Sequence, residues 1–413
     1  MMTCQFWVTR KSRHCKFKAK EGSQYCAEHA QGEADGGDLR IPCPFDLGHS
    51  VFKSKLEQHL RKCNARPLKP GDRPFYREAI NALNPPSVVD ETDRDRPEDD
   101  LIQLVQEVGS RVLPEDILAA FEECAPAVED SESEEEASGD ENDGKSISNS
   151  LKHQLQHAAL YERIRARCET VPEGERVLIV EFGAGKGGLS NYVWEQLKNG
   201  RKEEGQSMHS NCHLGNIEFV LVDRSNSRSK KDAKMRNTGA SVSRLHVDIC
   251  DLDLCDLVRS KGITRLLAIS KHLCGAATCL TINALRPVMR QGLAKVSLCL
   301  ALCCHQSCSW DVYPNRQFLR ENLLASDSQS FAQLKAMTSW AVCKLDGGRE
   351  AAEQPGPKRS KTLDHKRHVG WLAKRLLDYG RLQALQSYGS EKCLLSTYCS
   401  ASVTLENFIL SKD

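Results

Sequence analysis

The stretch VLIVEFGAGKGGLSNYV, residues 177–193, decides the fold class of this 413-residue chain. An apolar run typical of a buried strand leads through closely spaced glycines into a helical pattern that begins near Leu189. Glycines let the backbone approach a ligand, and an open α/β sheet binds its cofactor at the carboxyl ends of its strands. The sequence therefore predicts an α/β domain with a cofactor site at this loop.

The glycine pattern fits two classes of cofactor. It matches G-x-G-x-x-G of dinucleotide sites and equally acid-x-G-x-G-x-G of methyltransferases that use S-adenosyl-L-methionine (AdoMet). The acid favours AdoMet, because a carboxylate repels a pyrophosphate but attracts an ammonium group. We therefore expect AdoMet to be bound by Glu181, Gly183, Gly185 and Gly187.

Two aspartates at the ends of the next strands extend this cofactor site. Asp223 ends EFVLVD and is placed for the ribose hydroxyls of either cofactor, although it lies 38 residues beyond Gly185 instead of the ~20 of dinucleotide folds. Asp248 ends LHVD, and we assign it to the adenine amino group. A helix N-cap is an equally good interpretation of Asp248.

Outward from the glycine loop, strand-like runs alternate with helical ones. The runs RVLIVEFGAG, EFVLVDR, SRLHVDI, RLLAISKH and VSLCLALCC are strand candidates, a helix is expected near 150–169, and a helix at 366–379 leads to a final strand near 402–410. Apolar strands separated by helices predict a parallel sheet covered on both faces. The expected fold is α/β, a Rossmann-like AdoMet methyltransferase domain over 149–411 with a loose insert at 346–364.

Two later strands end in residues capable of chemistry, in RLLAISKHLCG and VSLCLALCCH. Lys271, His272 and His305 are the candidate acid, base or phosphate-binding groups, and a structural role is an equal alternative for each. Cys304, His305 and Cys308 are a weaker candidate for a metal cluster, because they contain no C-x2-C pair.

The first part of the chain carries two sets of zinc ligands and few aliphatic residues. The sets have the spacings C-x10-C-x10-C-x2-H and C-x5-H-x9-H-x3-C and consist of Cys4, Cys15, Cys26 and His29, and of Cys43, His49, His59 and Cys63. Tetrahedral Zn²⁺ supplies folding energy on the order of 10 kcal/mol where an apolar core is missing. We expect two structural zinc modules, at 1–32 and 40–67. The alternatives are unpaired surface thiols for the first and a short amphipathic hairpin with two merely polar histidines for the second.

Basic and aromatic side chains accompany both zinc modules. They are Arg10, Lys11, Arg13, Lys16, Lys18 and Lys20 with Phe6, Trp7 and Phe17 in the first, and Lys53, Lys55, Arg61 and Lys62 in the second. Basic groups around aromatic rings suit phosphates and unstacked bases. RNA is the expected partner, with a protein partner as the alternative.

Composition sets wider limits. Lys and Arg number 57 against 56 Asp and Glu, so the net charge of +1 argues neither for nor against a polyanionic partner. No run approaches the ~18 apolar residues of a membrane helix, and no secretory leader is visible. We expect a reducing compartment, nucleus and/or cytoplasm, and no membrane partner. Helical signals at 68–126 predict a connector, and the acidic run at 127–148 predicts a disordered linker.

In this order, the motifs resemble those of a known family. The C-C-C-H and C-H-H-C ligands, then VEFGAGKGGLS, KHLCGAAT, ALCCHQSCSW and TLENFIL, are similar to those of eukaryotic tRNA 2′-O-methyltransferases that modify nucleotide 4 of the acceptor stem. The resemblance covers both zinc modules and essentially all of 150–410. It departs from the family at Gln306, where a histidine is expected, so position 306 is not assigned a catalytic role.

The resemblance implies methyl transfer from AdoMet to a ribose 2′-hydroxyl in tRNA of the glycine, proline and histidine types. Such an enzyme must align oxygen, carbon and sulfur and help the proton depart. We expect Lys271 to hold a phosphate or stabilise the alkoxide, and His305 to accept the proton, with His272 as its rival. The alternatives are an AdoMet-dependent methyltransferase of proteins or small molecules whose zinc fingers bind a protein, and a non-catalytic RNA-binding factor.

Overall fold

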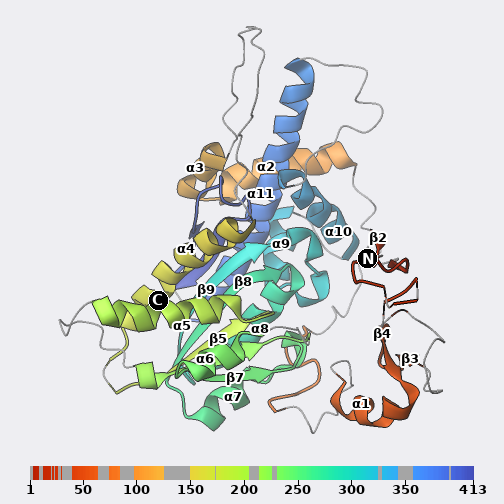
Figure 1. The fold of residues 1–413 in the computed structure, drawn as a ribbon. Coiled ribbons are helices and arrows are strands. Elements are labelled where there is room, and N and C mark those ends of the chain that lie inside the picture. Colours follow the sequence, from red (N-terminus) through yellow and green to blue (C-terminus); the bar gives the residue numbers. More distant parts are fainter. Residues whose placement is uncertain are drawn as a thin grey trace, which may run out of the picture. The chain divides into compact units, whose positions relative to one another are not determined.

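In the computed structural model the chain forms two compact units, Met1–Asp72 and Arg73–Asp413 (Figure 1). The residues that the structure describes are 3–8, 13–19, 21–22, 24–26, 29, 40–63, 74–83, 97–124, 149–172, 174–203, 214–225, 230–323, 328–342, 357–389 and 392–413.

The larger unit is built on a seven-stranded sheet with the order β10-β11-β9-β8-β5-β6-β7. Its strands are β5 (Val177–Phe182), β6 (Ile217–Val222), β7 (Ser241–Leu245), β8 (Arg265–Cys274), β9 (Lys295–Cys303), β10 (Cys393–Thr397) and β11 (Phe408–Lys412). The strands from β9 to β7 are parallel, and β11 runs antiparallel to both of its neighbours. The predicted parallel sheet is confirmed for β9 to β7, and the antiparallel pairs that β11 forms with β9 and β10 make the whole sheet mostly parallel. Its strand order reverses between β5 and β8, which is where open α/β sheets form a ligand-binding crevice.

All five strand candidates from the glycine loop to VSLCLALCC overlap strands, but the third ends earlier than predicted: β7 stops at Leu245, so Asp248 follows the strand and does not end it. The C-terminal prediction was less accurate. The strand expected near 402–410 begins only at Phe408, and the antiparallel strand β10 was not predicted. On β10 the side chains alternate between buried Cys393 and Leu395 and exposed Leu394. An edge strand with an exposed leucine does not show the clean apolar and polar alternation that marks a strand in sequence.

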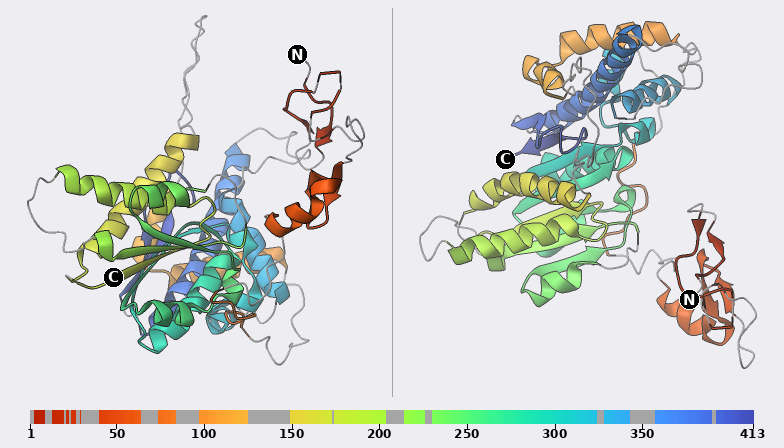
Figure 2. Two further views of the ribbon diagram at one scale, coloured as in Figure 1. Left: turned by 60° about the horizontal axis from the view of Figure 1, so that its bottom comes forward. Right: turned by 45° about the horizontal axis from the view of Figure 1, so that its top comes forward.

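Helices cover both faces of the sheet (Figure 2). Ile179 and Val180 are neighbours on β5 and both fully buried, but they belong to separate apolar clusters, because successive strand residues point to opposite faces. The cluster of Ile179 includes side chains of α4 (Asn149–Glu169), α5 (Gly188–Glu203) and α6 (Asp232–Asn237), and that of Val180 includes α7 (Leu254–Lys261), α8 (Ala276–Arg290), α9 (Arg316–Leu323), α10 (Ser328–Met337) and α11 (Pro357–Ser387).

The helical signals at 68–126 form α2 (Glu98–Val112) and α3 (Glu115–Cys124), which pack in the same core as α11. Gly109 of α2 allows close approach, since a Cβ there would lie 2.9 Å from Leu372 Cδ2 of α11. The segment predicted as a connector therefore contributes to the core of the larger unit. The acidic linker at 127–148 and positions 346–356 of the insert lie outside the described residues. The rest of that insert begins α11, which extends beyond both ends of the helix predicted at 366–379.

Short 3₁₀ helices connect the longer elements: η4 (Leu214–Asn216), η5 (Ile249–Asp251), η6 (His305–Ser307), η7 (Trp310–Val312) and η8 (Thr338–Ala341). Across the described part of the chain, no helix combines the length and apolar character needed to cross a membrane.

In the part of the smaller unit that the structure describes, there are two short β-ribbons, a 3₁₀ helix and one α-helix. Strand β1 (Trp7–Val8) pairs with β2 (Arg13–His14), and β3 (Arg40–Cys43) pairs with β4 (Asp46–Phe52), followed by η2 (Lys53–Lys55) and α1 (Leu56–Lys62). Within the residues described for this unit, every buried side chain belongs to a cysteine. Thiols thus occupy the place of an apolar core, which requires a metal to hold the unit together.

Gly275 joins the end of β8 to α8 and explains the glycine in KHLCG. It has a φ of +45°, and a Cβ there would lie 2.4 Å from the carbonyl carbon of Ser307 and 2.7 Å from the backbone N of Cys308. Its own N–H donates to the carbonyl oxygen of Cys303 at 3.2 Å. The backbone at Gly275 therefore packs directly against the backbone of the loop after β9.

We predict that Gly275→Ala destabilises the larger unit by about 3 kcal/mol, from the left-handed φ and from the overlap with the Ser307 backbone. Gly262→Ala is the control: its φ is +59° but a Cβ there has no neighbour within 4 Å, so we expect a loss of about 1 kcal/mol. Urea unfolding followed by tryptophan fluorescence measures both. Equal losses of unfolding free energy in the two variants would show that the Ser307 backbone moves aside at no cost.

Candidate functional site

The glycine loop leaves β5 at the carboxyl edge of the sheet. Gly183, Gly185 and Gly187 have φ values of +65°, +51° and +75°, a region that favours glycine. A Cβ at Gly187 would lie 3.2 Å from Leu221 Cδ1, whereas a Cβ at Gly185 would have no neighbour within 4 Å. The loop therefore has open space beside the Gly185 backbone, as a cofactor-binding loop requires.

Glu181 lies at the end of β5 and is 4 % exposed. Its carboxylate accepts hydrogen bonds from the Ser190 backbone N at 3.0 Å and from the Ser190 hydroxyl. Ser190 is in the first turn of α5, where the helix dipole favours negative charge. Burial still raises the pKa of Glu181 to about 7, against the lowering effect of Ser190 and of the positive charge of Arg244. A cation bound nearby would favour the charged form.

Asp223 follows β6 and is hydrogen-bonded to the glycine loop. The N–H of Gly185 donates to Asp223 Oδ2 at 2.6 Å, and that of Ser225 donates to Oδ1 at 2.7 Å. Burial acts to raise the pKa of Asp223, but the hydrogen bonds from Ser225 and Gly185 outweigh burial and lower it. The structure thus brings three predicted cofactor residues together, Glu181, Gly185 and Asp223.

Asp248 caps the 3₁₀ helix η5. Its Oδ1 accepts from the Cys250 backbone N at 3.0 Å, and its Oδ2 lies 3.4 Å from Arg224 Nη1. Of the two interpretations of Asp248, the N-cap is therefore present in the structure. A contact with adenine stays a prediction.

Arg244 on β7 supports the glycine loop and was missed in the sequence. Its guanidinium binds both carboxylate oxygens of Asp232 at 2.7 Å, and its Nη1 donates to the carbonyl oxygen of Gly185 at 2.8 Å. A single arginine in a strand-like run carries no motif, so only the fold could reveal this role.

Lys271 lies in a bulge near the end of β8, where the register with β9 shifts between Ser270 and Leu273. Bulges next to active sites redirect side chains. Here Lys271 Nζ donates to His153 Nδ1 at 2.9 Å and to His157 Nε2 at 3.1 Å, both on α4. The two histidines were missed because only their spacing of four marks them as sharing one helix face.

The electrostatics of this cluster are coupled. Burial lowers the pKa of Lys271 to about 8, partly offset by the negative charge of Glu181. Burial and the positive charge of Lys271 lower the pKa of His157 to about 3. His157 is therefore neutral at physiological pH and accepts the hydrogen bond, and Lys271 loses its proton far more easily than an exposed lysine does.

His272 follows Lys271 and is exposed. Its ring lies 5.8 Å from that of His153, at an interplanar angle of 80°. It therefore belongs to the same cluster and is accessible to a substrate.

His305 occupies a different environment. Its imidazole has 0 % exposure, and Nε2 donates to Asp378 Oδ1 at 2.7 Å. Burial lowers the pKa of His305 to about 4, although Asp378 acts to raise it. The role of proton acceptor, which we expected from the sequence, does not fit this position, because a ribose hydroxyl cannot reach a fully buried ring.

The weaker candidate for a metal cluster, Cys304 with His305 and Cys308, is not formed. The Sγ of Cys308 accepts from Arg381 Nη2 at 2.8 Å in the interior. Among the described residues, Cys304 instead groups with Cys274 and Cys303.

The first zinc module brings its predicted ligands together. The ligand atoms of Cys4, Cys15, Cys26 and His29 all lie within 4.8 Å of one another. His29 Nδ1 is 3.5 Å from Cys4 Sγ and 3.4 Å from Cys26 Sγ, and the ring of Phe6 stacks on His29 at 3.9 Å. This set of soft and imidazole donors fits tetrahedral zinc.

The second zinc module brings three of its four predicted ligands together. The ligand atoms of Cys43, His59 and Cys63 lie within 4.8 Å, with 3.6 Å between the two Sγ atoms and 3.3 Å from His59 Nε2 to Cys43 Sγ. His49 is on β4, and its side chain lies outside what the structure describes. His49 as the fourth ligand stays a prediction.

The first module also exposes aromatic rings. Phe6, Trp7, Phe17 and Tyr25 are 38, 49, 62 and 38 % exposed. The basic residues Arg13, Lys16 and Lys18 are exposed as well, whereas Arg10, Lys11, Lys20 and the side chain of Lys62 lie outside the described residues. Exposed rings with basic neighbours are suited to stacking on bases.

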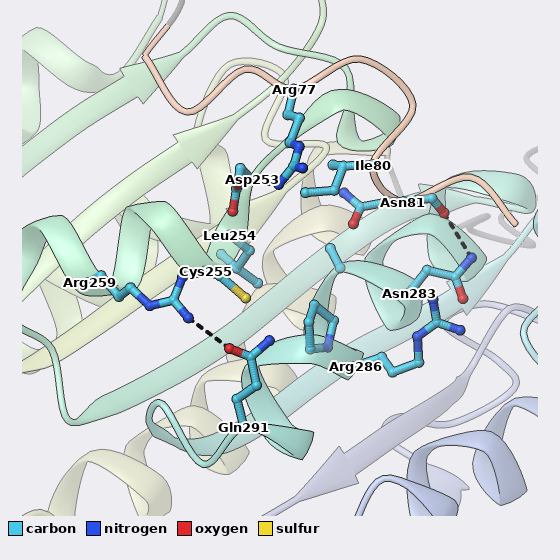
Figure 3. Close-up of a pocket in the computed structure, with 12 residues that line it drawn as sticks. Arg77, Ile80, Asn81, Asp253, Leu254, Cys255, Arg259, Asn283, Arg286 and Gln291 are labelled. Carbon is cyan, nitrogen blue, oxygen red and sulfur yellow. Dashed lines mark hydrogen bonds and ion pairs between the residues drawn. The ribbon is translucent and has the colours of Figure 1, made fainter.

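A separate pocket lies where segment 74–83 crosses α7 and α8 (Figure 3). The N–H of Asp253 donates to the Phe75 carbonyl at 2.8 Å, and the Asn81 side chain donates to the Ile249 carbonyl at 2.7 Å. Arg259 and Gln291, joined at 2.7 Å, lie at its other end. None of its lining residues was predicted to bind cofactor or substrate.

A glycine loop, two acids and a half-buried lysine at the carboxyl edge of a mostly parallel sheet, with two groups of zinc ligands, are typical of an α/β enzyme that carries zinc modules. The family model described as methyltransferase TRM13 matches residues 146–413. Models for the CCCH zinc finger in TRM13 protein and the U11-48K-like CHHC zinc finger match 2–30 and 40–64. The chain belongs to the TRM13 methyltransferase family, which confirms the resemblance.

Relatives with similar sequences extend over nearly the whole chain. The tRNA:m(4)X modification enzyme TRM13 homolog of Mus musculus is 28 % identical, covering 99 % of this chain and 93 % of its own. The tRNA:m(4)X modification enzyme TRM13 of Scheffersomyces stipitis is 30 % identical, covering 98 % of each chain. The solved structure of the CurJ carbon methyltransferase aligns with 64 % of this chain and 56 % of its own, at 14 % identity and a TM-score of 0.31.

For the zinc modules, we predict that Cys4→Ser and Cys43→Ser each remove one equivalent of zinc from the purified full-length chain, because each takes a ligand from a different cluster. Elemental analysis by mass spectrometry measures this. Cys250→Ser, at a half-buried thiol outside both clusters, should keep all zinc. If Cys4→Ser keeps all its zinc while Cys43→Ser loses one equivalent, then of the two modules only the second binds metal.

Proposed function

We propose that this chain is a tRNA methyltransferase that transfers a methyl group from AdoMet to the ribose 2′-hydroxyl of nucleotide 4 in the acceptor stem. Membership of the TRM13 family and relatives named tRNA modification enzymes support the tRNA substrate. The observation that carries the chemistry is the cluster of Lys271 with two imidazoles at the carboxyl edge of β8, next to β5 with its glycine loop. Transfer of the methyl group to tRNA of the glycine, proline and histidine types is proposed from the family resemblance.

The fold proposed for the larger unit is a Rossmann-like methyltransferase domain, and its donor set suits AdoMet. Bound AdoMet supplies an activated methyl group on a sulfonium. Gly183, Gly185 and Gly187 are proposed to let the backbone approach this ligand, with Glu181 facing its positive charge. Asp223 is proposed to bind the ribose hydroxyls and Asp248 the adenine amino group.

Lys271 is the proposed proton acceptor for the ribose hydroxyl. A neutral lysine amine has two N–H groups and one lone pair. Because His153 Nδ1 and His157 Nε2 each accept one N–H, the lone pair is left for the proton of the substrate. A lysine whose pKa is tuned to about 8 is suited to general base catalysis near neutral pH. His153 and His157 are positioning residues, and exposed His272 is proposed to contact the RNA.

The zinc modules are proposed to bind the tRNA rather than to react. A duplex acceptor stem is recognised mainly by shape and phosphates. Exposed Phe17, Trp7 and Lys16 on the first module supply a stacking and phosphate-binding surface. Transfer to proteins or small molecules, with the zinc modules docked on a protein, is the competing function.

Incubation of the full-length chain with methyl-labelled AdoMet and bulk tRNA tests the proposal. We expect label in tRNA and resistance of the phosphodiester after nucleotide 4 to alkaline hydrolysis, because that cleavage requires a free 2′-hydroxyl. Calorimetry should detect binding of an AdoMet analogue and should detect no binding of NAD⁺. Label on a base, label on protein only, or tRNA binding with no transfer would each contradict the proposed reaction.

For Lys271, we predict that the single-turnover rate rises with pH through about 8 and then levels off, because deprotonation creates the acceptor. Lys271→Met should lower the rate about 10²- to 10⁴-fold while leaving tRNA binding intact. Lys261→Met is the matched control, since Lys261 pairs with Glu218 near the start of β6, at the other end of the sheet.

The positioning role of His157 has its own signature. His157→Leu should lower the single-turnover rate and shift its pH profile. His157→Gln keeps a hydrogen-bond acceptor, so its rate and pH profile should be close to those of the wild-type chain. A rate that falls above pH 8 in the wild-type chain would instead identify the charged lysine as the active form.

A further inference from the structure

Three cysteines at the ends of β8 and β9 form a cluster that the proposed reaction does not use. The Sγ atoms of Cys274, Cys303 and Cys304 all lie within 4.8 Å of one another. Cys274 is exposed, Cys303 is buried and Cys304 is half-buried. The cluster belongs to the larger unit and is separate from both zinc modules.

The sulfur spacing in this cluster matches that of a zinc module in the same chain. The Sγ atoms of Cys274 and Cys303 are 4.0 Å apart, and those of Cys15 and Cys26 in the first module are also 4.0 Å apart. Tetrahedral coordination with Zn–S bonds of about 2.3 Å places two sulfurs about 3.8 Å apart. The thiols are therefore spaced as ligands of one metal and too far apart for a disulfide, whose S–S distance is about 2.05 Å.

The backbone at Cys304 makes the cluster possible. Successive residues of a strand point to opposite faces, so two adjacent cysteines would normally separate their thiols. Cys304 has a φ of +49° and a ψ of +49°, a left-handed conformation that is uncommon for a residue with a Cβ. This turn ends β9 and lets both thiols meet Cys274. Backbone strain of this kind persists where the surrounding structure requires it.

Among the residues that the structure describes, no fourth Cys, His, Asp or Glu joins this group, which leaves the fourth position to water. The nearby carboxylate of Glu406 accepts from the Cys304 backbone N at 3.3 Å and from Lys374 Nζ at 2.6 Å, so both of its oxygens are already engaged. Exposure of Cys274 allows solvent to reach the sulfur atoms. Three thiolates and one open position are a donor set that prefers a soft divalent ion.

We propose that Cys274, Cys303 and Cys304 bind a third Zn²⁺ ion, with water in the fourth position. Cys274 lies three residues beyond Lys271, and both other ligands lie at the end of β9. The ion therefore joins the ends of two neighbouring strands beside the proposed catalytic cluster. This inference stands on the thiol geometry and does not depend on which substrate the chain methylates.

Zinc analysis of the full-length chain tests the proposal directly. The wild-type chain should carry three equivalents and Cys274→Ser two, while Cys250→Ser, at a half-buried thiol outside the cluster, should carry three. Cys274 is exposed, so its serine variant is expected to fold, and near-ultraviolet circular dichroism checks this. Two equivalents in the wild-type chain, or three in Cys274→Ser, would overturn the third site.

Cobalt substitution provides a second measurement that does not rely on total metal. The cluster supplies three of the eight cysteine ligands in the three groups, so the sulfur-to-cobalt charge-transfer absorption should fall by roughly three eighths in Cys274→Ser. Cys304→Ser should give the same loss. An unchanged spectrum, or a Cys274–Cys303 disulfide found by peptide mapping of protein kept under reductant, would contradict metal binding.

Discussion

The interior of the larger unit depends on one buried carboxylate. Asp378 on α11 has 0 % exposure. Its Oδ1 accepts hydrogen bonds from His305 Nε2 at 2.7 Å and Arg381 Nη1 at 2.9 Å, and its Oδ2 forms an ion pair with Arg375 Nη2 at 2.9 Å. Removing such charges from water is unfavourable unless they are paired and hydrogen-bonded together. Arg381 also donates to the Gly275 carbonyl oxygen at 3.2 Å. One ionic network thus connects α11 with the loops after β8 and β9.

This network determines what His305 and its neighbours do. His305 anchors the loop after β9, and the contact of Gly275 with the Ser307 backbone joins that loop to the end of β8. The two loops are therefore fixed to each other and to α11. Lys271 and Cys274 lie at the end of β8, which these fixed loops make rigid. A rigid strand end suits side chains whose geometry must be accurate.

The sequence was sufficient to predict those features whose residues lie close together in the chain. The glycine loop, the five central strands and seven of the eight zinc ligands all depend on residues close together in the chain, and the structure contains them where the sequence predicts them. Contacts between distant residues left no such signal. His153 and Lys271 are 118 residues apart, and His305 and Asp378 are 73 apart. A histidine at a strand end indicates chemistry, but only the partner on α11 shows that His305 is buried.

The electrostatic argument for a cationic cofactor also changes in the structure. Asp223 is the acid with a lowered pKa, and it is bound to the Gly185 and Ser225 backbone, so its charge holds the loop in shape. Glu181 has a pKa raised to about 7 by burial and is therefore the acid that responds to a ligand. By linkage, a cation that favours charged Glu181 is bound more tightly when Glu181 is charged. A pyrophosphate in the same place would favour the protonated acid. In the proposed function, the preference for AdoMet over a dinucleotide therefore lies in an acid whose charge depends on the ligand bound beside it, and not in a carboxylate that is always charged.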